Sequence, residues 1–115
     1  MQVSHSLQND ILVITPEFES LDAKEAPEFK KMVLDLLAEN SRHNNKVILD
    51  LRNLQFLDSS GLGAFLSVLR TMNTQGGSLK LVNMNPSIRT IFELVSMHKI
   101  FDIYASVAAA AQTFT

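Results

Sequence analysis

Short apolar runs alternate along the chain with longer segments in which apolar residues recur at every third or fourth position. Runs of four to eight residues rich in valine, isoleucine and leucine are typical of strands. The second spacing is typical of a helix with one buried face. The apolar runs predict five strands, which cover residues 3–7, 11–15, 46–51, 78–82 and 101–104.

The first two predicted strands are separated by the Gln-Asn-Asp of residues 8–10, residue types that favour a turn. We therefore expect these strands to form a hairpin. Residues 11–15 are apolar on both faces of the strand, so this strand should be buried. Pro16 ends its pairing or marks a sheet edge, and residues 17–21 are expected to form a connecting loop.

The first helix has two candidate starts. Asp22 can cap a helix that begins at Ala23, with Glu25 completing a capping box. Pro27 favours a start at Ala26 instead, because proline is tolerated at the first helical position. Both starts are open from the sequence alone. The apolar positions expected to be buried in this helix are Phe29, Met32, Val33, Leu36 and Leu37.

Three more helices are predicted. One runs over residues 60–74 and ends at the Gln-Gly-Gly of residues 75–77, since glycine is the usual left-handed residue after a helix. Another opens at Pro86, and Ser106 caps an alanine-rich last helix over residues 107–112. The positions expected to face inward are Leu62, Phe65, Leu66 and Leu69 in the second helix and Ile88, Ile91, Phe92 and Val95 in the third.

The order strand, helix, strand over residues 46–82 predicts a right-handed crossover between parallel strands. The hairpin at the start of the chain adds an antiparallel pair, so the sheet should be mixed. We therefore predict an α/β fold for residues 1–115, a single domain with a mixed sheet of about five strands and about four helices packed on it.

The residues between the third strand and the second helix carry the candidate chemistry. Asp58, Ser59 and Ser60 are of the types that cap helix starts, because their side-chain oxygens accept free backbone N–H groups. A serine hydroxyl there also lies where the helix dipole favours an anion such as phosphate. These residues alone leave open whether they only cap the helix or also accept a phosphate.

The segment Asp58-Ser59-Ser60-Gly61-Leu62-Gly63, preceded by Leu49-Asp50-Leu51 and Phe56-Leu57, resembles the core motif of the STAS-domain anti-sigma factor antagonists. The resemblance extends to Leu21-Asp22-Ala23 upstream and Pro86-Ser87-Ile88 downstream. It therefore covers nearly the whole chain and implies one STAS-like domain.

This resemblance implies that Ser59, directly after the aspartate, accepts a phosphate from an anti-sigma factor that is itself a serine kinase. It also implies that the unphosphorylated form binds this kinase and releases a sigma factor, and that a serine phosphatase reverses the modification. A phosphate adds about −1.5 to −2 charge, which would expel the partner by electrostatics and desolvation. The implied partner-binding residues are Asp22, Asp58, Ser59, Ser60, Gly61, Leu62 and Gly63.

Other functions stay open at this point. Within binding modules, the alternative is a STAS subunit of a stress-sensing or lipid-transport complex. The family usually carries a glycine just before Leu21, but residues 16–20 contain none and are about one residue longer, which leaves the choice of partner open. A serine hydrolase is disfavoured, since residues 57–61 lack the first glycine of G-x-S-x-G. Asp50 in its buried strand is expected to make a structural hydrogen bond.

The amino-acid composition disfavours several further classes of function. The chain is 46% hydrophobic and 19% charged with a net charge of −2, a globular composition that disfavours nucleic-acid binding. No signal peptide or membrane span is predicted. The absence of cysteine excludes disulfides and fits the cytoplasm, where we expect a monomer or weak dimer. No motif indicates a cofactor, a metal or catalysis, so we expect no enzyme activity.

Overall fold

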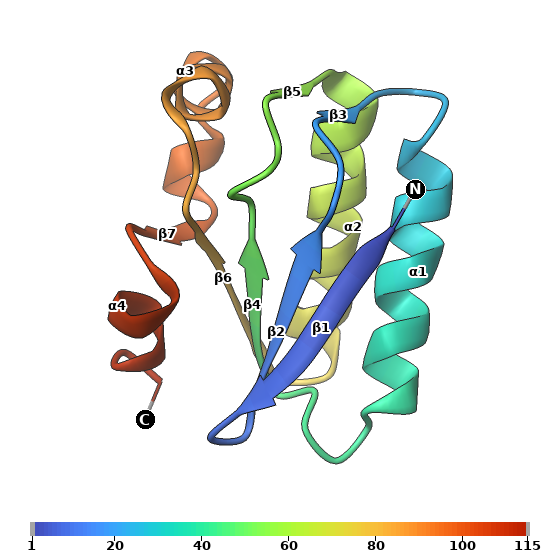
Figure 1. Ribbon diagram of the computed structural model, residues 1–115, viewed down its shortest axis with the longest axis vertical. Helices are drawn as coiled ribbons and strands as arrows, with labels where there is room; N and C mark the ends of the chain where they lie inside the picture. Colours follow the sequence, from blue (N-terminus) through green and yellow to red (C-terminus); the bar gives the residue numbers. More distant parts are fainter. Residues whose placement is uncertain (1, 115) are drawn as a thin grey trace.

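A five-stranded sheet forms the centre of the protein, here a computed structural model in which residues 2–114 are described (Figure 1). Its strands are β1 (Val3–Gln8), β2 (Ile11–Pro16), β4 (Lys46–Asp50), β6 (Ser78–Val82) and β7 (Asp102–Tyr104). They lie in the order β1-β2-β4-β6-β7, with β1 antiparallel to β2 and the other pairs parallel. The predicted mixed sheet of an α/β protein is confirmed.

The first two strands form the predicted hairpin. Its turn residues Asn9 and Asp10 have φ angles of 51° and 72°, the left-handed values that a two-residue hairpin turn requires. Strand β2 is buried on both faces, as Leu12 and Val13 show with exposures of 0% and 4%. Strand β1 lies at the sheet edge and is mostly exposed.

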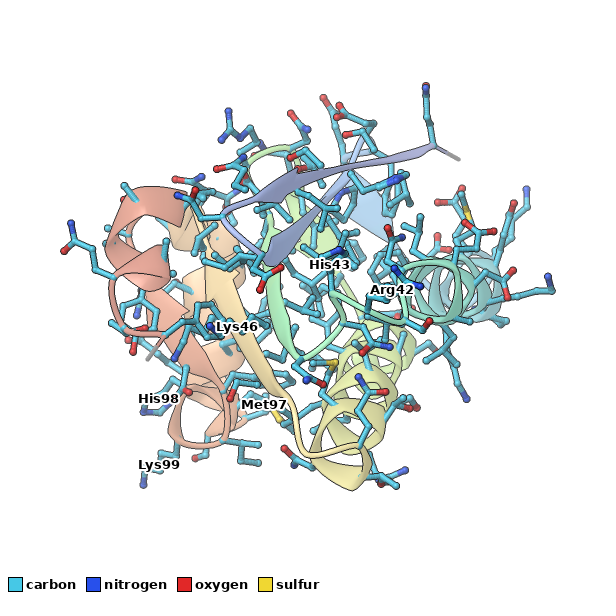
Figure 2. All side chains as sticks on the ribbon, turned by 90° about the horizontal axis from the view of Figure 1, so that it is seen from below. Arg42, His43, Lys46, Met97, His98 and Lys99 are labelled. Atoms are coloured by element: carbon cyan, nitrogen blue, oxygen red, sulfur yellow. The ribbon has the colours of Figure 1, made fainter. Side chains whose placement is uncertain are left out.

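Four α-helices and one 3-10 helix pack on this sheet: α1 (Ala26–Glu39), α2 (Ser59–Thr74), α3 (Pro86–Leu94), η1 (Met97–Lys99) and α4 (Val107–Ala111). The chain passes from β2 to β4, β6 and β7 in the order in which these parallel strands lie in the sheet. Because each connection is a right-handed crossover, the connecting helices α1, α2 and α3 lie on one face. Helix α4 covers the other face (Figure 1). In η1, Met97 packs against the core, whereas His98 and Lys99 lie at the periphery (Figure 2).

Aromatic rings connect the helices across the larger core. The ring centroids of Phe29 and Phe65 lie 5.6 Å apart, those of Phe65 and Phe92 6.2 Å, and those of Phe92 and Phe101 5.7 Å. Aromatic pairs at such separations stabilise a core beyond the burial of their area. On the opposite face of the sheet, a smaller core includes the fully buried Ala110 of α4.

Helix α1 begins at Ala26, the later of the two predicted starts. Glu25 occupies the cap position, and its side chain makes no capping hydrogen bond. The alternative start with its capping box does not form: Asp22 Oδ1 accepts from the N–H of Lys24 at 3.0 Å, in a turn before the helix. The position of Pro27 explains this start, because proline in the first turn leaves no N–H without an acceptor.

The buried helix faces agree with the predicted ones only in part. Met32 and Leu36 are half-buried, because they lie beside the exposed edge strand β1. Leu66 and Leu69 are half-buried as well, since the buried face of α2 is centred on Phe65 and Val68 and includes Ala64 and Met72. Val95 follows the end of α3 and is 47% exposed. The residues buried in α2 are Gly61, Leu62, Ala64, Phe65, Val68 and Met72.

Two short strands were missed by the sequence prediction. Strands β3 (Ser20–Leu21) and β5 (Phe56–Leu57) pair in parallel as a separate two-stranded sheet, where residues 17–21 had been expected to form only a loop. Two residues are too few to show a strand period. Their pairing brings the segment before α1 against the start of α2 (Figure 1).

Candidate functional site

Helix α2 begins at Ser59, one residue earlier than predicted, and Asp58 is its N-cap. Asp58 Oδ1 accepts hydrogen bonds from the N–H groups of Ser60 and Gly61 at 2.9 and 3.0 Å. These two bonds satisfy free N–H groups of the first turn, and the helix dipole favours the negative charge. The capping role predicted for Asp58 is confirmed.

The two serines of the motif lie in different surroundings. Ser59 is exposed, and among residues 2–114 its hydroxyl has no hydrogen-bond partner. Ser60 is half-buried and lines a groove of about 290 Å³ between α1 and α2, together with Ala26, Pro27 and Gly63. The hydroxyl at position 59 is therefore the more accessible of the two, and its backbone is fixed in the first turn of a helix.

A second segment is bound to the start of α2. The N–H of Ala23 donates to Asp58 Oδ2 at 3.1 Å, and the N–H of Asp58 donates to the carbonyl oxygen of Leu21 at 3.3 Å. Asp22 lies between Leu21 and Ala23, which are both hydrogen-bonded to Asp58, and Ser59 directly follows Asp58. The structure therefore brings these two predicted site residues to one place, although they are far apart in the sequence.

The two glycines of the motif differ sharply. A Cβ atom at Gly61 would lie 2.6 Å from the carbonyl oxygen of Leu21 and 3.0 Å from Leu57 Cβ. A Cβ atom at Gly63 would meet nothing within 4 Å, and Gly63 is exposed. Gly61 and the neighbouring Leu62 are buried beneath the surface that Ser59 and Gly63 present.

The carboxylate of Asp50 is buried at the end of β4, with an exposure of 2%. It accepts hydrogen bonds from Nε of Arg52 at 2.9 Å and from Nδ2 of Asn83 at 3.0 Å. The structural hydrogen bond predicted for Asp50 is confirmed, and the bond to this carboxylate raises the pKa of the Arg52 guanidinium. Sequence reasoning singled out neither Arg52 nor Asn83, although an arginine two residues after a buried acid is a usable signal.

The segment between β4 and β5 is held from both sides. Asn53 Nδ2 donates to the carbonyl oxygen of Pro16 and to the carboxylate of Glu17, both at 3.2 Å. Asn85, the N-cap of α3, donates to the carbonyl oxygen of Leu54. These bonds fix the backbone that leads into β5 and Asp58, so the start of α2 has a defined position.

The surroundings of this site offer no alternative chemistry among the residues that the structure describes. Among residues 2–114, no three histidine, aspartate or glutamate side chains lie close enough to hold a metal ion. No helix in the described part of the chain is both long enough and apolar enough to cross a lipid bilayer. His43 Nδ1 lies 2.7 Å from Asp10 Oδ1, but this pair joins two loops at the end of the sheet away from Ser59 (Figures 1 and 2).

Comparisons with a family model, with curated proteins and with solved structures all match the chain to the same kind of protein. The family model described as the STAS domain matches residues 3–110. An anti-sigma F factor antagonist from Paenibacillus polymyxa is 36% identical over 63 residues, an alignment that spans 55% of this chain and about half of that relative (54%). An anti-sigma-B factor antagonist from Bacillus subtilis is 29% identical over 106 residues, 91% of each chain. The crystal structure of a candidate anti-sigma factor antagonist from Thermotoga maritima matches with a TM-score of 0.85 at 27% identity, covering 95% of this chain and 91% of that one.

Proposed function

Because this chain belongs to the STAS domain family, we propose that it acts as an anti-sigma factor antagonist whose binding is switched by phosphorylation of Ser59. In the unphosphorylated form it binds an anti-sigma factor that is a serine kinase, and a sigma factor is released. The names of its relatives support the antagonist role. The exposed hydroxyl of Ser59 at the start of a capped helix is the single observation that supports the switch.

The cap determines where a phosphate on Ser59 would lie. The N–H groups of Ser60 and Gly61 already donate to Asp58 Oδ1, so they are not free to bind the phosphate. The new charge of about −1.5 to −2 therefore remains at the surface next to Asp58, the residue whose carboxylate binds the N–H of Ala23. Like charges repel, so the phosphate turns away from Asp58, toward solvent or toward a bound partner.

A partner packed over the start of α2 meets this charge directly. Closing the contact would strip water from the charged phosphate, which is strongly unfavourable. The helix itself keeps its cap and its buried face. Phosphorylation therefore releases the partner without unfolding the chain.

The other components of the switch are those that the resemblance to this family implies. An anti-sigma factor with serine kinase activity adds the phosphate, and a serine phosphatase removes it and restores the binding form. The chain acts as a binding protein rather than as an enzyme. Sigma factors act with RNA polymerase, so we place the exchange in the bacterial cytoplasm.

Incubation with the anti-sigma serine kinase of the same organism and ATP tests the proposal. We expect intact-mass analysis to show one added phosphate on the wild type and on Ser60→Ala, and none on Ser59→Ala. Ser60→Ala is the matched control, because it removes a neighbouring hydroxyl from the same turn. A phosphate that remains on Ser59→Ala would contradict the assignment.

A further inference from the structure

Gly61 allows an unusually close approach between α2 and the backbone before α1. A Cβ atom at this position would lie 2.6 Å from the carbonyl oxygen of Leu21, a distance that real Cβ atoms do not show. To reach ordinary van der Waals contact, that oxygen would have to retreat from 2.6 to about 3.4 Å. The second obstacle, Leu57 Cβ at 3.0 Å, is in β5, in the residue that pairs with Leu21 of β3.

The approach fixes the segment that carries Asp22. Leu21 is bound through its carbonyl oxygen to the N–H of Asp58, and Ala23 is bound through its N–H to Asp58 Oδ2. Asp22 is thus held between two contacts to the residue that immediately precedes Ser59. The bond from Asp58 to Leu21 is already long at 3.3 Å, so a small retreat of the carbonyl breaks it.

We infer that Gly61 is a positioning residue that sets the spacing between Asp22 and Ser59, so that a partner kinase engages both at once. This inference rests on the proposed phosphorylation of Ser59. A methyl group at position 61 displaces the segment around Asp22, while Asp58 Oδ1 still caps α2 and keeps Ser59 on its helix. A kinase docked on the displaced segment then holds the hydroxyl out of line, and errors of about 1 Å slow reactions about 100-fold.

The first test uses the free protein. In Gly61→Ala, we expect the amide of Ala23 to exchange its hydrogen at least tenfold faster than in the wild type. The matched control is Gly77→Ala, whose methyl group meets the carbonyl oxygen of Asn45 at 3.0 Å and Met72 Cε at 2.7 Å beyond the other end of α2. Its clash is milder, because Met72 Cε is the end of a flexible side chain, so the variant should lower stability slightly and leave exchange at Ala23 unchanged at temperatures where both variants are folded.

The second test uses the anti-sigma serine kinase of the same organism with ATP. We expect kcat for phosphorylation of Gly61→Ala to fall at least tenfold, with KM changed less than threefold, while Gly77→Ala retains both wild-type values. Asp58→Asn provides an independent variant. Its amide oxygen still caps α2, but its NH₂ group cannot accept from Ala23, so it should show the same loss of kcat and the same faster exchange.

The outcomes separate this inference from the proposed function. If the wild type takes up no phosphate, the proposed function fails, and exchange at Ala23 still decides whether Gly61 positions the segment. If the wild type is phosphorylated and folded Gly61→Ala matches it in kcat, the inference is wrong. If Gly61→Ala does not fold, the same two measurements on Asp58→Asn decide the question, and wild-type values in both would overturn it.

Discussion

At the scale of single residues, two carboxylates organise the end of the molecule where β4 and β5 finish. Asp58 binds the N–H groups of Ala23, Ser60 and Gly61 and so joins two distant segments. Asp50 is buried and binds side chains instead. Asp58 therefore fixes backbone at the candidate site, whereas Asp50 fixes the side chains of Arg52 and Asn83.

Replacing Asp50 by asparagine should lower the free energy of unfolding by about 2 kcal/mol, because hydrogen bonds to charged groups contribute roughly 1.5–3 kcal/mol and Arg52 loses its ion pair. Urea unfolding measures this loss. Asp35→Asn is the control, since its pair with Lys31 is exposed, and its effect should not exceed about 0.5 kcal/mol. Equal losses for both variants would contradict the structural role of Asp50.

The sequence predicts these residues unevenly. The burial of Asp50 in an apolar strand already required a hydrogen-bond partner, and the structure confirms one. One partner is Asn83, which has a left-handed φ of 56° and follows a different strand from the one that carries Asp50. Because the two residues are far apart in the sequence, no local pattern identified this partner. In the same way, the contact of Ala23 with Asp58 depends on the pairing of β3 with β5, which is too short to be predicted.

At the scale of elements, α2 is the helix on which the fold and the site both depend. Its first turn carries the candidate site, and its middle contributes Phe65 to the chain of aromatic rings. The predicted period located this helix to within one residue at its start. It did not identify the buried Ala64, Val68 and Met72, because hydrophobic spacing alone does not show that α1 packs beside this helix.

Truncating Phe65 to alanine should cost roughly 3–5 kcal/mol, since the ring is fully buried and the cavity cannot collapse between two aromatic neighbours. Thermal melting measures the loss. Phe56→Ala is the control, because Phe56 is 49% exposed and should change stability far less. An unchanged melting temperature for Phe65→Ala would refute the placement of this helix.

Two glycine substitutions in and after α2 should have opposite effects. Gly63→Ala should stabilise the protein by about 0.5–1 kcal/mol, because its Cβ meets nothing and alanine favours a helix. Gly76 has a φ of 76°, so Gly76→Ala should cost roughly 1 kcal/mol through backbone strain. Guanidinium unfolding of both variants checks the signs, and destabilisation by Gly63→Ala would show that this position is not open.

At the scale of the whole molecule, Ser59 lies on the surface although the helix it begins is part of the core. Most of the core lies between the sheet and α1, α2 and α3, whereas Ser59 lies at the end of the sheet where the chain enters α2 (Figure 1). The mixed sheet and its layers follow from strand order and crossover handedness, so the sequence predicted them well. A charge added at the exposed Ser59 therefore changes the surface while the core remains as it is.

Ser59→Asp should bind the anti-sigma kinase more weakly than the wild type, because it places negative charge beside Asp58. Its loss should be smaller than that caused by phosphate, since one charge replaces about −1.5 to −2. Ser59→Ala should bind as the wild type does and change stability by no more than about 0.5 kcal/mol, because Asp58 and not Ser59 caps the helix. Isothermal titration calorimetry measures the affinities, and tighter binding by Ser59→Asp would contradict the electrostatic switch.

Phosphate on Ser59 should dissociate the complex with the anti-sigma kinase, and one affinity comparison tests this most directly. The chain is purified in its unphosphorylated form and in a form with phosphate mapped to Ser59, and the Kd of each for the anti-sigma kinase is measured at one ionic strength. We predict that the phosphorylated form binds at least tenfold more weakly, a difference of about 1.4 kcal/mol or more. Equal affinities of the two forms, or phosphate mapped to Ser60 instead, would contradict the account.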